Sequence, residues 1–413
     1  MKKLFKAVAI LIIAIIIVIL GFTVANRLLV PFMIENLFAY EKVEYENQLH
    51  PQYDEYGVPY FVTDGDFKVM QLTDIHLGGS LLSYTDDIKA LDAVAAMITA
   101  EKPDLVVITG DTSFAVPWAA NLNNSTPHQY LILLMENLGV YWTTTFGNHD
   151  AENYNFYGRE AVGEMYDDDS YQYCLFESDD GGVYGVGNHL INVRNTQGLI
   201  SQTIFMMDTN SYTGDDPLGF SWIYDNIHDD QIEWYRTQVE RYSAYNRTVL
   251  AAMPESERPK NVEDFTTVQS LLFVHIPLIE MRTAYHEYLA AGEKDTDDVK
   301  YIFGDVGESE PYVYPSEIEE EMFETMLELG STRAMFFGHD HLNNIVLEYK
   351  GFTFCYGYSV DFFAYIGIDK VGSQRGCTMI TCSPDASFEI VHENYYQDKY
   401  QPLNGKTPVD MGN

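Results

Sequence analysis

Histidine, aspartate and asparagine recur in five short motifs of this 413-residue chain, and each motif directly follows an apolar run. In chain order the motifs are TDIH, TGD, GNHD, FVH and GHDH. Imidazole nitrogens combined with carboxylate and amide oxygens are the ligands that borderline divalent metals prefer. The motifs therefore supply seven candidate metal ligands: Asp74, His76, Asp111, Asn148, His275, His339 and His341.

The number of candidate ligands points to two metal ions. One zinc ion takes about four ligands, often three from the protein and one water. Two ions some 3.5–4 Å apart that share a bridging carboxylate need about as many ligands as the motifs supply. Such a pair holds a hydroxide between the ions and neutralises the oxygens of a phosphate. His149 and Asp150 of the GNHD motif are left over from this count.

The elements around the motifs must bring them together. The apolar runs before the motifs are typical of buried strands, and they alternate with amphipathic patterns that indicate helices. This alternation predicts an α/β sandwich, in which the carboxyl ends of strands converge on one crevice. The helical patterns cover residues 86–103, 127–139, 229–242 and 316–330. The last of these begins with a capping box formed by Ser316 and Glu319.

The ordered set of motifs resembles the calcineurin-like metallophosphoesterase superfamily over about residues 66–392, most of the chain. TDIHLG, QIEWYR, FVHIPL and FFGHDH are most similar to its small purple-acid-phosphatase-like branch. The resemblance implies a four-layer α/β/β/α sandwich of two mixed sheets flanked by helices.

The resemblance also implies a role for each candidate residue. Asp74, His76 and His341 would hold one metal ion, and Asn148, His275 and His339 the other. Asp111 would bridge the two ions. His149 would protonate the leaving oxygen, and Asp150 would orient His149.

One position departs from the purple acid phosphatases. They carry Gly-Asp-x-x-Tyr with the tyrosine on iron, whereas Phe114 stands at that place here. Because phenylalanine has no oxygen, the iron–phenolate bond cannot form there, and iron, zinc and manganese all stay open.

We interpret the chain as a two-metal phosphoesterase that hydrolyses phosphate esters with a metal-bridging hydroxide. Small phosphomonoesters are the expected substrates, because two divalent ions with Asp74 and Asp111 leave a charge of about +2 that matches a monoester dianion. One alternative is a phosphodiesterase acting on nucleotides or phospholipid headgroups. Another is a non-catalytic binding protein on the same fold.

The N-terminus predicts attachment to a membrane. Lys2, Lys3 and Lys6 precede the uncharged residues 7–25, which span about 28 Å as a helix, roughly one bilayer core. We expect a single-pass anchor in the cell membrane with the catalytic domain on the extracytoplasmic side. A cleaved signal, which would release a secreted protein, is the alternative. The predicted layout is a basic flank (1–6), a transmembrane anchor (7–25), a juxtamembrane linker (26–60), a metallophosphoesterase domain (61–395) and a polar tail (396–413).

Charge excludes one class of partner. The formal net charge is −38, and the part after the N-terminal segment carries 20 basic and 62 acidic residues, a net charge of −42. Such a surface repels nucleic acid.

An extracytoplasmic location permits disulfides, with three possible full pairings, and we interpret the four cysteines as structural: Cys174, Cys355, Cys377 and Cys382.

Overall fold

The protein is described by a computed structural model that covers residues 2–116, 120–178, 182–213, 223–365, 367–368, 375–397 and 399–400. Most of the predicted C-terminal tail, residues 396–413, lies outside this part of the chain.

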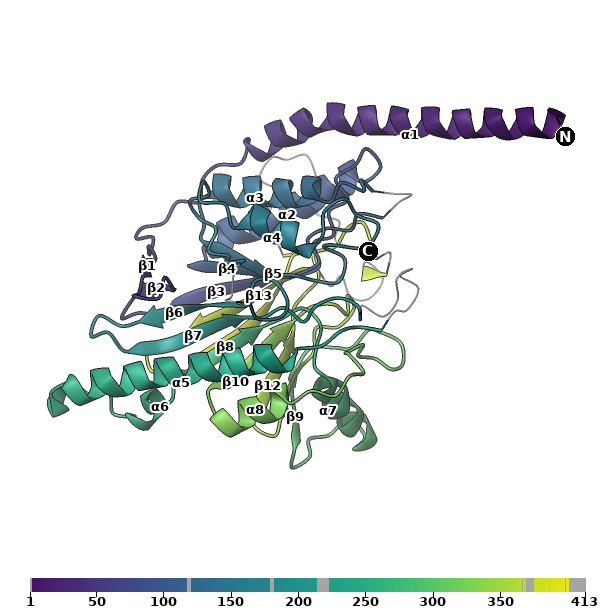
Figure 1. Ribbon diagram of the computed structural model, residues 1–413. Coiled ribbons are helices and arrows are strands. Elements are labelled where there is room, and N and C mark those ends of the chain that lie inside the picture. The colour runs from purple at the N-terminus through teal and green to yellow at the C-terminus, as the bar shows by residue number, and fades with distance from the viewer. Residues whose placement is uncertain are drawn as a thin grey trace.

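Two mixed sheets form the centre of the fold (Figure 1). In the described residues the smaller sheet has five strands, in the order β14 (Phe388–Asn394), β13 (Gly376–Cys382), β3 (Phe67–Leu72), β4 (Leu105–Thr109) and β5 (Trp142–Thr145). The larger sheet has nine strands there, in the order β1 (Gln52–Tyr53), β2 (Pro59–Val62), β6 (His189–Arg194), β7 (Ile200–Met206), β8 (Ser270–Phe273), β10 (Thr332–Phe337), β12 (Phe352–Tyr356), β11 (Val346–Tyr349) and β9 (Val299–Phe303). The strands β3, β4 and β5 are parallel, and so are β7, β8, β10 and β12.

Helices cover the outer faces of both sheets (Figure 1). The helices are α1 (Lys2–Leu37), α2 (Tyr84–Glu101), α3 (Ser125–Leu138), α4 (Arg159–Tyr166), α5 (Asp229–Ala252), α6 (Glu263–Thr266), α7 (Ile279–Ala290) and α8 (Met322–Leu329), with a 3-10 turn at Glu255–Glu257.

Alternation along the strands builds the layers. In β8, Leu271 and Phe273 belong to the core between the sheets, whereas Leu272 faces the outer core together with Tyr235 of α5 and Met281 of α7. The α2 and α3 helices pack on the smaller sheet through a large apolar cluster. This arrangement confirms the predicted four-layer α/β/β/α sandwich of two mixed sheets.

The predicted helix over residues 316–330 begins later than its sequence pattern indicates, at Met322. Ser316 does not cap a helix, because its hydroxyl donates to the Tyr224 carbonyl and accepts the Ile318 amide. Long-range contacts with the segment before α5 therefore replace the predicted capping box.

The N-terminal helix is longer than the predicted anchor. Its residues Val8–Leu37 are long and apolar enough to cross a membrane, although a signal sequence would pass the same test. Residues 26–37, expected to be part of a linker, continue the helix and pack on the body through the buried Met33 and Leu37. The strands β1 and β2 also extend the sheet before residue 61, where the domain was predicted to begin.

All four cysteines are free thiols, so none of the three disulfide pairings is present. Burial raises the pKa of Cys174, Cys355, Cys377 and Cys382, which makes them unreactive packing residues.

Candidate metal centre

The seven predicted ligands leave the carboxyl ends of five parallel strands. Asp74 and His76 follow β3, Asp111 follows β4, and Asn148 follows β5. His275 follows β8, and His339 and His341 follow β10. Since both sheets direct these strand ends to the same edge, the fold delivers all seven side chains to one region.

Four of the predicted ligands have left-handed backbone. The φ angles are 50° at Asp74, 51° at His76, 50° at Asp111 and 75° at His339. Such a conformation costs a non-glycine residue about 1–3 kcal/mol and clusters at functional sites. These four residues therefore adopt an unfavourable backbone conformation that directs their side chains toward one another.

Two glycines allow the loops to approach one another. A Cβ on Gly147 would collide with the carboxylate and amide nitrogen of Asp111, and a Cβ on Gly338 would collide with Thr73 and the Asp74 carboxylate. The glycines of the GNHD and GHDH motifs are thus required for close contact between loops.

Four of the side chains form one tight cluster. Ligand atoms of Asp74, His76, Asp111 and His341 all lie within 4.8 Å of one another. The Nε2 atom of His76 is 3.2 Å from Oδ2 of Asp111, and Nε2 of His341 is 3.4 Å from Oδ1 of Asp74. Two carboxylates and two imidazoles at these separations fit one divalent cation.

The other three side chains lie beside the same Asp111 carboxylate. The Nε2 atom of His275 is 3.3 Å from Oδ2 of Asp111 and 3.2 Å from Oδ1 of Asn148. The rings of His275 and His339 have centroids 5.2 Å apart. His275 Nδ1 donates to the Thr109 carbonyl at 2.7 Å, which leaves Nε2 as the lone-pair nitrogen when the ring is neutral. Asp111 therefore stands between two groups of ligands, where a bridging residue would be.

The pKa shifts of the buried histidines reflect the negative charge that the carboxylates bring to the site. Burial lowers the pKa of His275, but the Asp111 and Asp74 carboxylates and the Thr109 carbonyl together outweigh burial and raise this pKa to about 9. Burial opposes charging of His76 too, and Asp361 and Asp111 raise its pKa well above the usual value. Burial and the neighbouring His275 instead lower the pKa of His339 to about 3, so it stays a neutral imidazole. In the metal-free site, protons on histidine thus balance the negative charge of the carboxylates, as bound metal ions would. The set of carboxylate, imidazole and amide donors fits two metal ions.

His149 lies at the edge of this cluster, and its orienting partner differs from the predicted one. Nδ1 of His149 is 2.8 Å from Oε1 of Glu152, and the His149 amide donates to Asp111 Oδ1 at 2.8 Å. The Asp150 carboxylate instead accepts three backbone amides, those of Asp111, Ser113 and Gly147, at 2.8–3.0 Å. The prediction that Asp150 orients His149 is therefore wrong, because a carboxylate occupied by loop amides holds the loops together. Glu152 takes the orienting position.

Asp361 also escaped prediction from the sequence. It is fully buried, and its Oδ2 lies 3.6 Å from Nδ1 of His76. Amides of the loop that follows, from Phe363, Ala364 and Tyr365, donate to its carboxylate at 2.6–2.7 Å. Burial opposes ionisation of Asp361, while His76 lowers its pKa. A carboxylate behind a ligating histidine orients the ring and increases its basicity.

Aromatic side chains surround the cluster. Phe114 lies edge-on to His76 and His149, with centroids 5.4 and 4.9 Å away. Tyr224 contacts His339 and Tyr365 contacts His341 in the same edge-on manner. The aromatic wall therefore comes from three separate loops.

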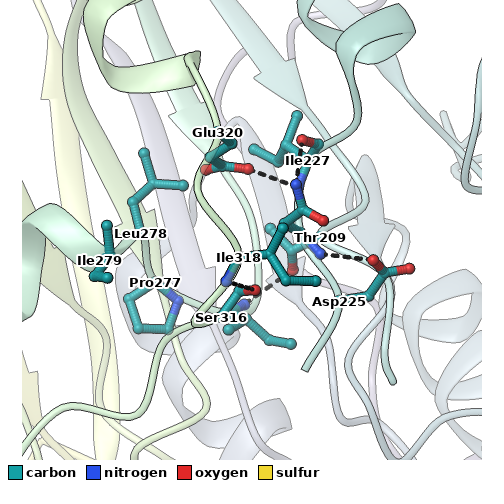
Figure 2. Close-up of a pocket in the computed structure, with 11 residues that line it drawn as sticks. Thr209, Asp225, Ile227, Pro277, Leu278, Ile279, Ser316, Ile318 and Glu320 are labelled. Carbon is teal, nitrogen blue, oxygen red and sulfur yellow. Dashed lines mark hydrogen bonds between the residues drawn. The ribbon is translucent and has the colours of Figure 1, made fainter. Parts of the chain in front are cut away.

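A small cavity lies beside the metal centre (Figure 2). Its lining includes Ile276 and Pro277, which directly follow His275, and Glu320, whose carboxylate accepts the Ile227 amide at 2.8 Å. None of the seven predicted ligands is among its lining residues. The cavity thus belongs to the packing behind the site.

The chain is similar in sequence to a family of known proteins. The sequence model of the calcineurin-like phosphoesterase family matches residues 67–343. Probable inactive purple acid phosphatase 14 of Arabidopsis thaliana is 25% identical over 340 residues, 76% of this chain and 75% of the relative. Phosphatase DCR2 of Saccharomyces cerevisiae is 25% identical over 306 residues, 69% of this chain and 46% of the relative. A dimetal phosphatase from Danio rerio aligns in structure with a TM-score of 0.40 and 11% identity, over 80% of this chain and 100% of that one.

A protein with this fold and this cluster of aspartate and histidine is a metallophosphoesterase in class. The chain belongs to the calcineurin-like phosphoesterase family, and its relatives confirm the likeness to purple acid phosphatases.

Proposed function

We propose that this chain is an active two-metal phosphoesterase, anchored in a membrane, that prefers phosphomonoesters of small size. The observation that carries the proposal is the convergence of Asp74, His76, Asp111 and His341 within 4.8 Å, with His275 and Asn148 on the other side of Asp111. Some relatives bear names that call them inactive. A chain that had lost catalysis would no longer need four strained ligands and a complete donor set.

Each residue has a defined task in this proposal. Two bound metal ions would supply an activated water and neutralise the phosphate oxygens. Asp74, His76 and His341 would hold one ion, Asn148, His275 and His339 would hold the other, and Asp111 would lie between the two. His149 gives a proton to the leaving oxygen, Glu152 orients the His149 ring, and Asp150 fixes the loops that carry both.

The charge of the site supports monoesters. Two divalent ions with Asp74 and Asp111 leave about +2, and a phosphomonoester is near −2. A diester carries about −1 and needs room for a second organic group, which the aromatic wall of Phe114, Tyr224 and Tyr365 restricts. A phosphodiesterase acting on nucleotides or phospholipid headgroups is the second candidate.

The N-terminal helix supports a location at the cell membrane. Residues 7–25 would cross the bilayer with Lys2, Lys3 and Lys6 inside, and the acidic catalytic domain would then lie on the extracytoplasmic side. We retain the proposed division into anchor, connecting segment and catalytic domain, and iron, zinc and manganese all stay open as the bound metals.

One matched experiment tests activity and ester class together. Purified full-length protein is loaded with zinc, manganese or iron and assayed with an aryl monoester and the diester of the same leaving group. We expect kcat/KM to be higher for the monoester. A higher value for the diester with every metal would favour the phosphodiesterase, and no turnover of either ester by a protein with two bound ions would favour a binding protein.

A further inference from the structure

Among the described side chains of α1, those that pack on the body lie near the C-terminal end of the helix. Asn26, Met33 and Leu37 are buried, whereas apolar residues such as Ile10 and Leu20 are exposed. Oδ1 of Asn26 accepts the amide of Leu81 at 2.9 Å. Since the uncharged segment ends at residue 25, this contact marks the point where the helix leaves the body and would enter the bilayer.

The loop that meets the helix at this point also belongs to the metal centre. Leu81 lies five residues after His76, so at most about 18 Å of chain separates them. In Figure 1 the free part of α1 extends from the body on the side where β3 ends and its loop begins. The loop that carries Asp74 and His76 therefore comes close to the expected bilayer surface.

Apolar side chains connect the site with this surface. Leu81 and Leu82 are 49% and 59% exposed beside the helix. The Phe363 ring lies against Gly78, a residue of the loop that joins His76 to Leu81. The ring centroid of Phe363 is 6.0 Å from that of Phe114. Phe114 in turn contacts His149. Exposed leucines next to a transmembrane helix are stabilised by insertion into the lipid interface.

From this placement we propose that the substrate is a lipid phosphomonoester, whose phosphate enters the metal centre from the bilayer to which the protein is anchored. The proposal rests on the proposed phosphomonoesterase function, and it replaces small soluble esters with lipid esters as the physiological substrate. Water oxygen joins phosphorus and keeps one of its protons, the bond from phosphorus to the lipid oxygen breaks, and His149 supplies the proton that this oxygen gains. The other water proton is released to solvent, from which His149 is protonated again. The lipid alcohol stays in the membrane along Phe363, Leu81 and Leu82, and inorganic phosphate leaves into water.

Charge makes this source of substrate reasonable. Beyond its N-terminal segment the chain carries −42, which disfavours approach of anionic solutes from the bulk. A lipid in the same membrane reaches the site by diffusing in the bilayer plane, and the anchor holds the site there at high effective concentration.

The test uses full-length protein reconstituted in phosphatidylcholine vesicles. Phosphatidate or a long-chain alkyl phosphate is included in the bilayer, and p-nitrophenyl phosphate is assayed in solution. The double variant Leu81→Ser/Leu82→Ser is compared with Leu327→Ser, which changes an exposed leucine (41%) of α8, across the molecule from α1 (Figure 1). We expect turnover of the lipid esters to fall roughly tenfold in the double variant, with unchanged turnover of p-nitrophenyl phosphate, because two interfacial leucines are lost. Leu327→Ser should change neither.

Three results would overturn the proposal in distinguishable ways. Hydrolysis of p-nitrophenyl phosphate without hydrolysis of either lipid ester would refute lipid substrates and leave the proposed function standing. Equal lipid turnover in the double variant and the native protein would refute the role of the leucine loop in delivering the lipid. Failure with every ester in a protein that holds two metal ions would refute the proposed function itself.

Discussion

Replacement of Glu152 separates its role from that of Asp150. In the Glu152→Ala variant, His149 loses the carboxylate 2.8 Å from Nδ1, and the ring is no longer held with Nε2 available for proton transfer. A hydrogen bond to a charged group contributes about 1.5–3 kcal/mol. Because the side chains are 21% and 13% exposed, the lower half of that range applies, which corresponds to a loss of about 13–45-fold in kcat/KM. Glu152→Gln keeps an acceptor, so about 2–5-fold should be lost.

The assay depends on the leaving group. Phenyl phosphate needs a proton on its leaving oxygen, whereas p-nitrophenolate leaves without one. The Glu152→Ala loss should therefore appear with phenyl phosphate and shrink with p-nitrophenyl phosphate, at unchanged metal content by elemental analysis. Asp150→Ala should instead lower both rates together with metal content, since it frees the amides of three loop residues. Glu164→Ala, at an exposed position of α4, is the matched control. Equal losses with both esters in Glu152→Ala would refute the orienting role.

Four further results are expected. Elemental analysis should find two metal ions per chain, and Asp111→Asn should weaken both; one ion, unaffected by the substitution, would contradict the shared ligand. In the metal-free protein, His275 should contribute up to about 3 kcal/mol of stability below pH 6.5, and this contribution should be lost as pH rises through 9, because the pKa of His275 is raised from 6.5 to about 9; denaturant unfolding from pH 6.5 upward measures this loss, and the metal-loaded protein should not show it. An iron-loaded sample should lack a purple charge-transfer band, since Phe114 has no phenolate; a strong visible band would contradict this. Protease added to sealed cells should digest the catalytic domain, and full protection would reject the proposed orientation.

The strand-end motifs were the predictable part of this site. Asp74 and Asp111 each follow a short apolar run, and a parallel sheet can only bring such residues to one edge. Their separation in sequence is irrelevant once the fold is an α/β sandwich, so the pattern alone indicates the meeting of five loops.

The partners of His149 and His76 could not be found in the same way. Whether Asp150 or Glu152 faces His149 depends on the conformation of a turn, and the Asp150 side chain bends back to amides of its own loop and its neighbour. Asp361 comes from a loop after β12 that contains no motif. Ser316 carries a helix-capping signal that a contact with Tyr224 overrides. In each case the outcome depends on how loops contact one another in the folded structure, which the local sequence pattern does not specify.

Phenylalanine at position 114 affects the expected charge of the metal centre, and through that charge the expected metal ions and substrate. A tyrosinate at this position would add a negative charge to the two that Asp74 and Asp111 bring, and would suit a trivalent ion. Without it, a pair of divalent ions already leaves about +2, and a trivalent ion would leave more. The Asp361 carboxylate supplies a negative charge behind His76, with Oδ2 at 3.6 Å from Nδ1 of the ring. It would do so without binding a metal ion itself. In the proposed two-metal state, a phosphomonoester dianion would neutralise the remaining positive charge better than a diester would. The phenylalanine that should abolish the purple colour is thus also consistent with the proposed divalent ions and monoester substrate.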